Sequence, residues 1–252
     1  AAYCIGGLGG EYGNMNFRTY SFGNHIQEEK FKKGETTSAN KKYEFIDKLY
    51  HSILVKDDFN KTYPLRYKIA SLMEKYPDAW FRSDVKKAMN LLITEGYIFP
   101  KILYPACGSD ITFGFILPES QKYYVDPMEI SQEVIQESDP NGQFFLQWFE
   151  NFKQKDFDLA FIANAHGPWI HQKLPNHLKW WGFLLAEWNG WNFDASHYLS
   201  DERLLLRGVF TEKDGEISFI KENLEDYTEY ISTNKLGKSM YKKMARFYLF
   251  EK

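Results

Sequence analysis

The sequence feature that most constrains the fold of this chain is a short apolar segment followed by a turn of small residues. The segment is Lys101-Ile-Leu-Tyr-Pro-Ala-Cys-Gly-Ser-Asp110, and a second apolar run, Ile111 to Leu117, follows it. A further strand-like stretch, Tyr123-Tyr-Val-Asp126, then ends on an acid. Strand, turn, helix, strand and acid in this order predict the first half of a nucleotide-binding βαβ unit. In such a unit amides at the helix start face a ligand, and the acid accepts hydrogen bonds from ribose hydroxyls.

The stretch from Ile102 to Asp110 resembles the glycine-rich segment of class I S-adenosylmethionine-dependent methyltransferases, and the resemblance covers residues 100–130 best. It implies an α/β fold of the Rossmann-like methyltransferase type, a three-layer sandwich with an N-terminal helical cap. It also implies S-adenosylmethionine as a small-molecule cofactor. The residues that it assigns to cofactor binding are Tyr104, Ala106, Cys107, Gly108 and Asp110 around the methionine end, and Asp126 at the ribose.

The sequence departs from the family pattern at three positions. Tyr104 stands where the family usually has an acid, and Ala106 and Asp110 stand where it usually has glycines. An ionised Asp110 would repel the carboxylate of the cofactor. Asp126 has an alternative role as a cap of the following helix, and Cys107 is better explained as a small buried side chain than as a nucleophile. These departures support a competing hypothesis, a non-catalytic Rossmann-like protein that binds a partner.

Composition narrows the class of protein. The 252 residues fit one sizeable α/β domain with a helical extension, and the aromatic share of 18% indicates a ring-rich core or pocket. Cys4 and Cys107 cannot form a disulfide framework, which favours a reducing compartment, so we expect a soluble cytoplasmic protein. No apolar run is long enough to cross a bilayer, so no membrane partner is expected. The net charge of −3 gives no argument for nucleic acid.

Three regions follow from changes in pattern along the chain. Residues 1–40 are expected to form a flexible arm, residues 41–100 a helical cap, and residues 101–252 the Rossmann-like domain. Within the cap, helices are expected over Leu65 to Tyr76 and from Ser83 to Gly96. A winged-helix module is the alternative interpretation. Because the range 41–101 holds 12 Lys/Arg and 8 Asp/Glu, nucleic-acid binding by this region is a third hypothesis.

The remaining segments predict the rest of the domain. We expect a third strand that is short or displaced, because the spacing from Asp126 to Asp158 is tight. Helices are expected after Pro127 and over Gly142–Lys153, Leu178–Trp188 and Leu224–Ile231, and strands over Leu159–Ala163, Arg203–Phe210, Gly215–Ile220 and Ala245–Phe250. A terminal antiparallel pair suits the closing edge of a methyltransferase-like sheet.

Two polar residues follow the strand that ends at Ala163. In methyltransferase-like folds this loop lies beside the transferred methyl group, so the resemblance assigns Asn164 and His166 to the reaction centre. Imidazole can act as a general base toward a hydroxyl or amine, although a loop histidine satisfied by backbone explains His166 equally well. The acceptor is not identified by the sequence. No metal site is expected, because His171 and His177 do not share a helical face.

Five of the seven tryptophans fall within residues 169–200. Such rings could stack a planar substrate or a base. Core packing or a partner surface is the commoner use of clustered tryptophans.

Overall fold

A computed structural model describes residues 59–163, 168–188, 196–233 and 239–252, which fall into two compact units. The described part of the first unit lies within Ala1–Ser83, Ser109–Ile116 and Glu133–Pro140. The second unit comprises Asp84–Gly108, Leu117–Gln132 and Asn141–Lys252. The expected arm over residues 1–40 and the start of the expected cap lie outside the described residues. None of the described helices is long and apolar enough to span a bilayer.

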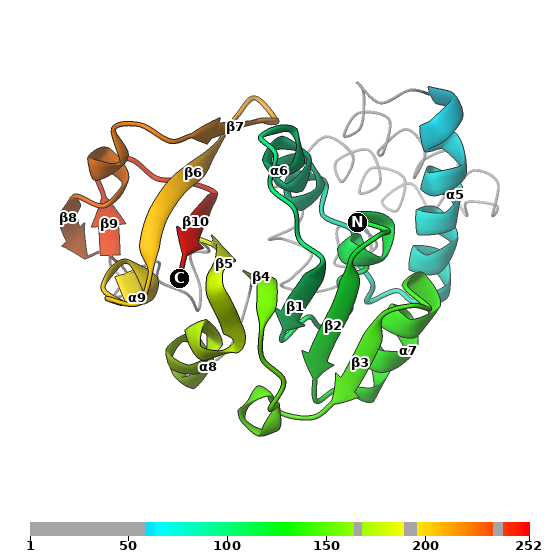
Figure 1. Cartoon of the computed structure of the whole chain (residues 1–252). Helices are drawn as coiled ribbons and strands as arrows, with labels where there is room; N and C mark the ends of the chain where they lie inside the picture. The colour runs from blue at the N-terminus through cyan, green and yellow to red at the C-terminus, as the bar shows by residue number, and fades with distance from the viewer. Residues whose placement is uncertain (1–58, 164–167, 189–195, 234–238) are drawn as a thin grey trace. The chain divides into compact units, whose positions relative to one another are not determined.

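The second unit is built on an eight-stranded sheet with the order β3-β2-β1-β4-β5-β10-β6-β7 (Figure 1). Its strands are β1 (Lys101–Pro105), β2 (Gln121–Asp126), β3 (Gln143–Leu146), β4 (Phe157–Ile162), β5 (Leu178–Glu187), β6 (Leu205–Lys213), β7 (Glu216–Ile220) and β10 (Phe247–Glu251). A separate antiparallel pair is formed by β8 (Tyr230–Thr233) and β9 (Ser239–Tyr241).

Five neighbouring strands, β3 to β5 in sheet order, run parallel, and β10 is antiparallel to both β5 and β6. The order 3-2-1-4-5 reverses between β1 and β4, as in doubly wound nucleotide-binding sheets. The antiparallel strands form the expected closing edge. The predicted α/β fold of the Rossmann-like methyltransferase type is therefore confirmed.

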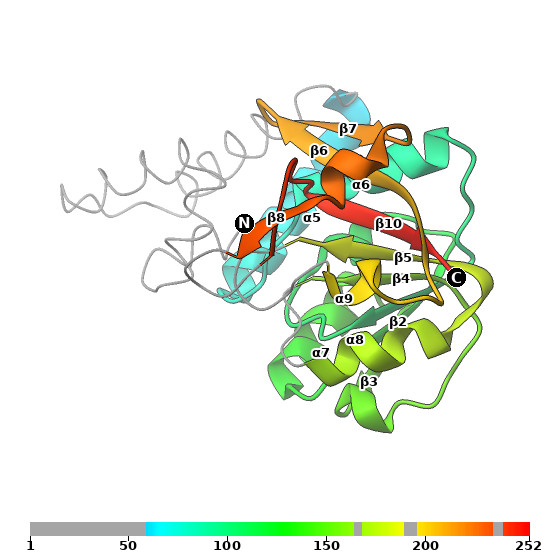
Figure 2. The same cartoon turned by 90° about the vertical axis from the view of Figure 1, so that its left-hand side faces the viewer.

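Both faces of this sheet are covered, which makes the second unit three-layered. On one face lie α8 (Pro168–Lys173) and α9 (Ser196–Leu199), over a core that includes Leu103, Ala160, Leu184, Tyr248 and Phe250 (Figure 2). On the other face the segment after α6 (Ser83–Thr94) packs its rings onto the sheet. Tyr97 meets Phe183 edge-on at 5.1 Å, and Phe210 stacks on Phe219 at 4.5 Å. The high aromatic content is therefore largely core.

The first unit has a smaller core of its own. It contains α5 (Phe59–Lys75), the short 3-10 helix η2 (Thr112–Phe115) and the second half of α7 (Glu129–Ser138). The ring of Phe81 packs edge-on against Phe115 at 6.3 Å. A Cβ atom on Gly114 would lie 2.8 Å from the carbonyl oxygen of Ser138, so only glycine allows this close approach.

Four predicted helices are wrong, and the reasons are physical. Residues 142–153 form β3 and the 3-10 helix η3 (Phe149–Asn151), and residues 178–187 form β5. Residues 224–231 form the 3-10 helix η5 (Leu224–Tyr227) and the start of β8, and the apolar run after Asp110 contributes only η2. The last four residues of β5 are all buried, so this strand lacks alternation and its apolar pattern resembles that of a helix. The elements β3, η2 and η5 have four residues each, and periodicity does not identify the type of so short an apolar run. The expected short third strand, the helix after Pro127 and the closing strands are confirmed.

A buried charge cluster joins α6 to the closing strands. Arg246, just before β10, donates to Asp84 at the start of α6, with distances of 2.7 Å from Nη2 and 2.9 Å from Nε to Oδ2. Its Nη2 also lies 2.9 Å from Oε1 of Glu187, at the end of β5. Both carboxylates are buried, so the guanidinium compensates two charges that water cannot reach.

Replacing Arg246 with Met should therefore destabilise the fold by about 3 kcal/mol or more, because two buried carboxylates lose the guanidinium that compensates their charge. Arg207→Met is the matched control. Arg207 pairs with Glu251 but is 41% exposed, so its loss should cost less than about 1 kcal/mol. Guanidinium unfolding of both variants measures the difference. Equal losses would contradict the role assigned to Arg246.

Candidate functional site

The loops that follow β1 and β2 are tied together by the carboxylate of Asp126. The Gly108 amide donates to Oδ2 of Asp126 at 3.0 Å, and the Met128 amide donates to Oδ1 at 3.0 Å. The Ala106 amide donates to the carbonyl of Val125 at 2.8 Å. Asp126 therefore holds the small-residue turn against the loop that leads into α7.

The turn itself adopts a left-handed conformation at two positions. Ala106 has φ 50° and Gly108 has φ 53°. Glycine accepts this conformation freely, whereas alanine pays about 1–2 kcal/mol for the contact between its Cβ and the following carbonyl. The glycine at 108 thus serves the turn, as expected, and the alanine at 106 adopts a conformation that glycine would accept more easily.

Asp126 keeps acceptor capacity beyond these two bonds. An ionised carboxylate offers about four lone-pair positions, and the two amides occupy two of them. The side chain is 5% exposed at the carboxyl end of β2. This geometry accommodates both roles predicted for Asp126: it caps the Met128 amide ahead of α7, and it can still accept from a diol.

Two other predicted site residues are buried in the core. Tyr104 is 3% exposed, and its ring meets Phe161 edge-on at 4.9 Å. Cys107 is 1% exposed, in keeping with a small buried side chain. The structure thus brings Gly108 and Asp126 together, with Ala106 in the same turn, while Tyr104 and Cys107 contribute their bulk to packing.

Asp110 belongs to the first unit and has local partners. Its Oδ1 accepts hydrogen bonds from the amide of Thr112 at 2.9 Å and from its hydroxyl at 2.5 Å. A backbone bridge joins Asp110 to Trp80. The fully buried side chain therefore stabilises the turn into η2. Because η2 has only four residues, the long helix expected after the turn, with its row of free amides, is not present.

Exposed apolar side chains surround the carboxyl ends of β2 and β3. Met128 is 54% exposed, Leu146 is 44% exposed and Trp148 is 58% exposed. Leu146 is the register partner of Asp126, and the ring of Trp148 meets Trp169 edge-on at 6.5 Å. The sequence did not predict this set, because Leu146 and Trp148 fall in the helix expected over residues 142–153 and Met128 falls in the helix expected after Pro127.

Asn164 and His166 lie outside the described residues, so their role at the reaction centre stays a prediction. The strand before them, β4, pairs with β1 through Leu103 and Ala160. The reversal of strand order lies between these two strands, where α/β sheets usually bind ligands beyond the carboxyl ends.

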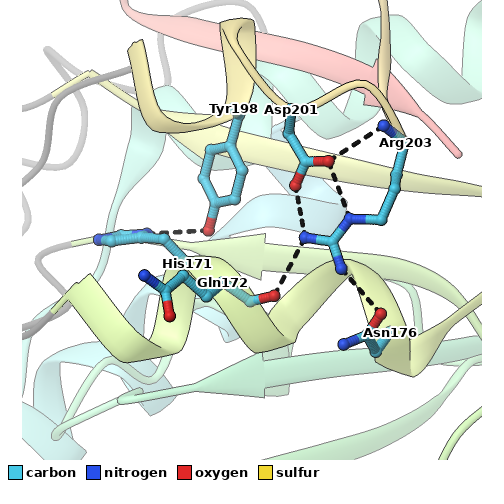
Figure 3. A network of polar contacts seen from close by, with 6 residues as sticks. All are labelled: His171, Gln172, Asn176, Tyr198, Asp201 and Arg203. Atoms are coloured by element: carbon cyan, nitrogen blue, oxygen red, sulfur yellow. Dashed lines mark hydrogen bonds and ion pairs between the residues drawn. The ribbon is translucent and has the colours of Figure 1, made fainter.

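A hollow of about 390 Å³ lies beside α8 and α9, away from Asp126, and is lined by His171, Gln172, His197, Ser200, Asp201, Glu202 and Arg203. Arg203 makes a bidentate contact with Asp201, with distances of 2.8 Å from Nε and 2.6 Å from Nη2 (Figure 3). It also donates to Asn176 Oδ1 at 2.8 Å and to the carbonyl of Gln172 at 3.0 Å. The guanidinium thus fixes the turn before β6 onto α8.

His171 is the buried group of this hollow. Its Nδ1 lies 2.9 Å from the hydroxyl of Tyr198, and its ring stacks on His197 at 5.1 Å. Burial, with a smaller effect of His197, lowers the pKa of His171 to about 4. His177 instead faces the carbonyl of Gln154 at 2.6 Å. In the described part of the chain, no three His, Cys, Asp or Glu side chains are grouped as a metal site.

No model of a known protein family matches the chain, and no curated protein matches its sequence. Solved structures do resemble it. A SAM-dependent O-methyltransferase from Thermotoga maritima has a TM-score of 0.44 and 11% identity, over 73% of this chain and 71% of that one. A TehB-like SAM-dependent methyltransferase from Corynebacterium glutamicum has a TM-score of 0.38 and 16% identity, over 64% and 95%.

The plantazolicin methyltransferase, solved with SAH, has a TM-score of 0.36 and 15% identity, over 62% of this chain. This chain covers 65% of that enzyme, which is less than two thirds of its length. The strand order described above, rather than these distant similarities, defines the fold.

The buried imidazole makes stability depend on pH. The unfolded chain takes up the His171 proton near pH 6.5, whereas the folded chain takes it up near pH 4. Between these values the unfolded state binds more protons, so stability rises with pH and is lost on acidification. Urea midpoints at pH 4.5, 5.5 and 6.5 should change less in His171→Gln than in the wild type. His197→Gln, which removes an exposed ring, should keep the wild-type dependence of the urea midpoint on pH. A wild-type dependence in His171→Gln would contradict the role assigned to the buried imidazole.

Proposed function

We propose that this protein transfers a methyl group from S-adenosylmethionine to an acceptor. The observation that carries the proposal is the placement of Asp126. This acid ends β2, which pairs with β1, one of the two strands at the reversal of strand order, and it retains lone pairs after it has fixed the Gly108 turn. An acid in this position suits a ribose diol.

The residues around Asp126 fit the rest of an adenosine-bearing molecule. Met128, Leu146 and Trp148 offer exposed apolar surface on which an adenine ring could pack. We propose that the turn from Ala106 to Gly108 faces the methionine end of the cofactor. S-adenosylmethionine, when bound, supplies an electrophilic methyl group on a sulfonium. The protein then has to align the acceptor with it and exclude water.

Asn164 and His166 complete the proposal at the reaction centre. They follow β4, the strand across the reversal from β1. We propose that Asn164 orients the acceptor and that His166 removes a proton from an acceptor hydroxyl or amine, since imidazole titrates near neutrality.

One observation favours a second function, a non-catalytic Rossmann-like protein that binds a partner. The Gly108 amide already donates to Asp126, and η2 is too short to present free amides at a helix start. Fewer main-chain donors are then available to a cofactor carboxylate. Binding measurements separate the two functions.

Calorimetric titration with S-adenosylmethionine and S-adenosylhomocysteine should give saturable heat with the wild-type protein. Asp126→Asn should weaken binding roughly 10- to 100-fold, as expected for losing hydrogen bonds to a charged acceptor. Because this variant also disturbs the turn, its folding is checked by circular dichroism. No heat with either ligand would favour the non-catalytic function.

Trp148→Ala should weaken binding of the same two ligands roughly tenfold, since stacking on a base contributes about 1–3 kcal/mol. Its exposed ring makes a folding defect unexpected. The matched control is Trp180→Ala, a 70% exposed tryptophan at the amino end of β5. Equal effects of the two substitutions would contradict an adenine site at Trp148.

A further inference from the structure

A turn within β5 displays two adjacent indoles to solvent at the amino ends of the strands. Trp180 is 70% exposed and Trp181 is 62% exposed. Their rings meet edge-on, with centroids 6.1 Å apart and planes at 82°. The described core buries most other large rings, so this pair is an exception. We call Lys179–Gly182 the tryptophan turn.

The tryptophan turn is an insertion in the ladder between β4 and β5. Phe157 pairs with Leu178 and Leu159 with Phe183, so one residue of β4 lies opposite four residues of β5. The Trp181 amide donates to the Lys252 carbonyl at 3.0 Å, and the Lys252 amide donates to the Gly182 carbonyl at 2.9 Å. These bonds hold the inserted residues in one conformation.

That conformation is costly. Trp181 has φ 67°, in the left-handed region that bulky side chains rarely adopt. A Cβ at Gly182 would lie 2.7 Å from the carbonyl oxygen of Phe157, so glycine is required there. Strained residues that persist in a stable structure often mark a functional surface. Here the strained residue is Trp181, whose indole is mostly exposed and contributes little to the core.

Cationic groups surround the tryptophan turn. Lys179 pairs with the buried carboxylate of Asp158, and the Lys252 ammonium donates to the Leu178 carbonyl at 2.8 Å. Lys155, Arg203 and Asp156 act on Lys252 electrostatically, Lys153 acts on the adjoining His177, and Lys101 donates to the Lys155 carbonyl. Carboxylates lie among these cations, because Asp201 pairs with Arg203, and Glu251, directly before Lys252, pairs with Arg207. Among these named groups, seven cations (Lys101, Lys153, Lys155, Lys179, Arg203, Arg207 and Lys252) meet four carboxylates (Asp156, Asp158, Asp201 and Glu251).

We propose that the tryptophan turn and its surrounding lysines bind single-stranded nucleic acid. Bases can stack on exposed indole faces whatever their sequence, and lysines bind the phosphates between them. Stable attachment to a bilayer needs a larger apolar face or an acyl chain in addition to cations. Two rings set among lysines match the alternation of base and phosphate better. The tryptophan turn lies near the amino end of β5, whereas Asp126 lies at the carboxyl end of the parallel strand β2. The proposal therefore does not depend on the cofactor site.

Fluorescence anisotropy with a labelled 20-nucleotide oligothymidylate tests the proposal. We expect binding at 50 mM NaCl that weakens on a log–log plot with a slope of about −2, as for roughly three phosphate contacts. Trp180→Ala should weaken binding roughly tenfold with an unchanged salt slope. The double substitution Lys153→Gln and Lys155→Gln should reduce the slope. Tyr230→Ala, which removes a 56% exposed ring on β8, should bind the oligonucleotide like the wild type.

Trp181→Gly distinguishes a loss of oligonucleotide binding from a loss of stability. Glycine accepts the positive φ, so this variant should have a higher urea midpoint than the wild type, yet weaker oligonucleotide binding. A lower midpoint would contradict the strain on which the argument depends.

Three results would overturn the proposal. One is no oligonucleotide binding at 50 mM NaCl, and another is binding that is insensitive to Trp180→Ala. The third is retention on phosphatidylglycerol vesicles that Trp180→Ala abolishes while oligonucleotide binding is unchanged, which would assign the turn to a membrane surface.

Discussion

The hydrogen bond between the Gly108 amide and Asp126 is the contact that orders the loops at the carboxyl ends of β1 and β2. Two parallel strands end side by side, and just beyond β1 the Ala106 amide still donates to the Val125 carbonyl. One carboxylate joins the two loops and also orders the approach to α7 through Met128. Because its acceptor capacity exceeds these two bonds, the group that shapes the edge can also contact a ligand. Structure and proposed chemistry thus share one side chain.

The sheet is held by aromatic packing on both faces rather than by many ion pairs. The rings of Phe161, Phe210 and Phe247 lie on one face, and those of Tyr248 and Phe250 lie on the other. Where charges are buried, as with Arg246 and its two carboxylates, they join elements that the rings do not connect. Such a core tolerates an unusual loop at its edge, because the exposed rings of the tryptophan turn add little to it, whereas the Gly108 turn contributes the buried Cys107.

The sequence allowed the fold class and the position of Asp126 to be predicted, because both follow from local order: a strand, a turn and an acid. It did not allow β5 to be recognised, since a strand covered on both faces has the apolar density of a helix. The exposure of Leu146 and Trp148 depends on the register of β3 beside Asp126, which is a tertiary property. The irregular pairing that places Lys179–Gly182 opposite the single residue Asp158 is also a tertiary property. Residues 164–167, with the predicted Asn164 and His166, are outside the described part of the chain.

The place of β10 has a consequence for how the second unit assembles. This strand lies between β5 and β6, although the β6–β7 hairpin precedes it along the chain. The hairpin forms from local contacts, but it meets the parallel strands through β10, whose Phe247 pairs with Glu187 of β5, 60 residues earlier in the chain. Closure of the sheet therefore waits for a long-range pairing, the kind of step that slows folding. Until then the pairing edges of β5 and β6 are open, and another chain could occupy them.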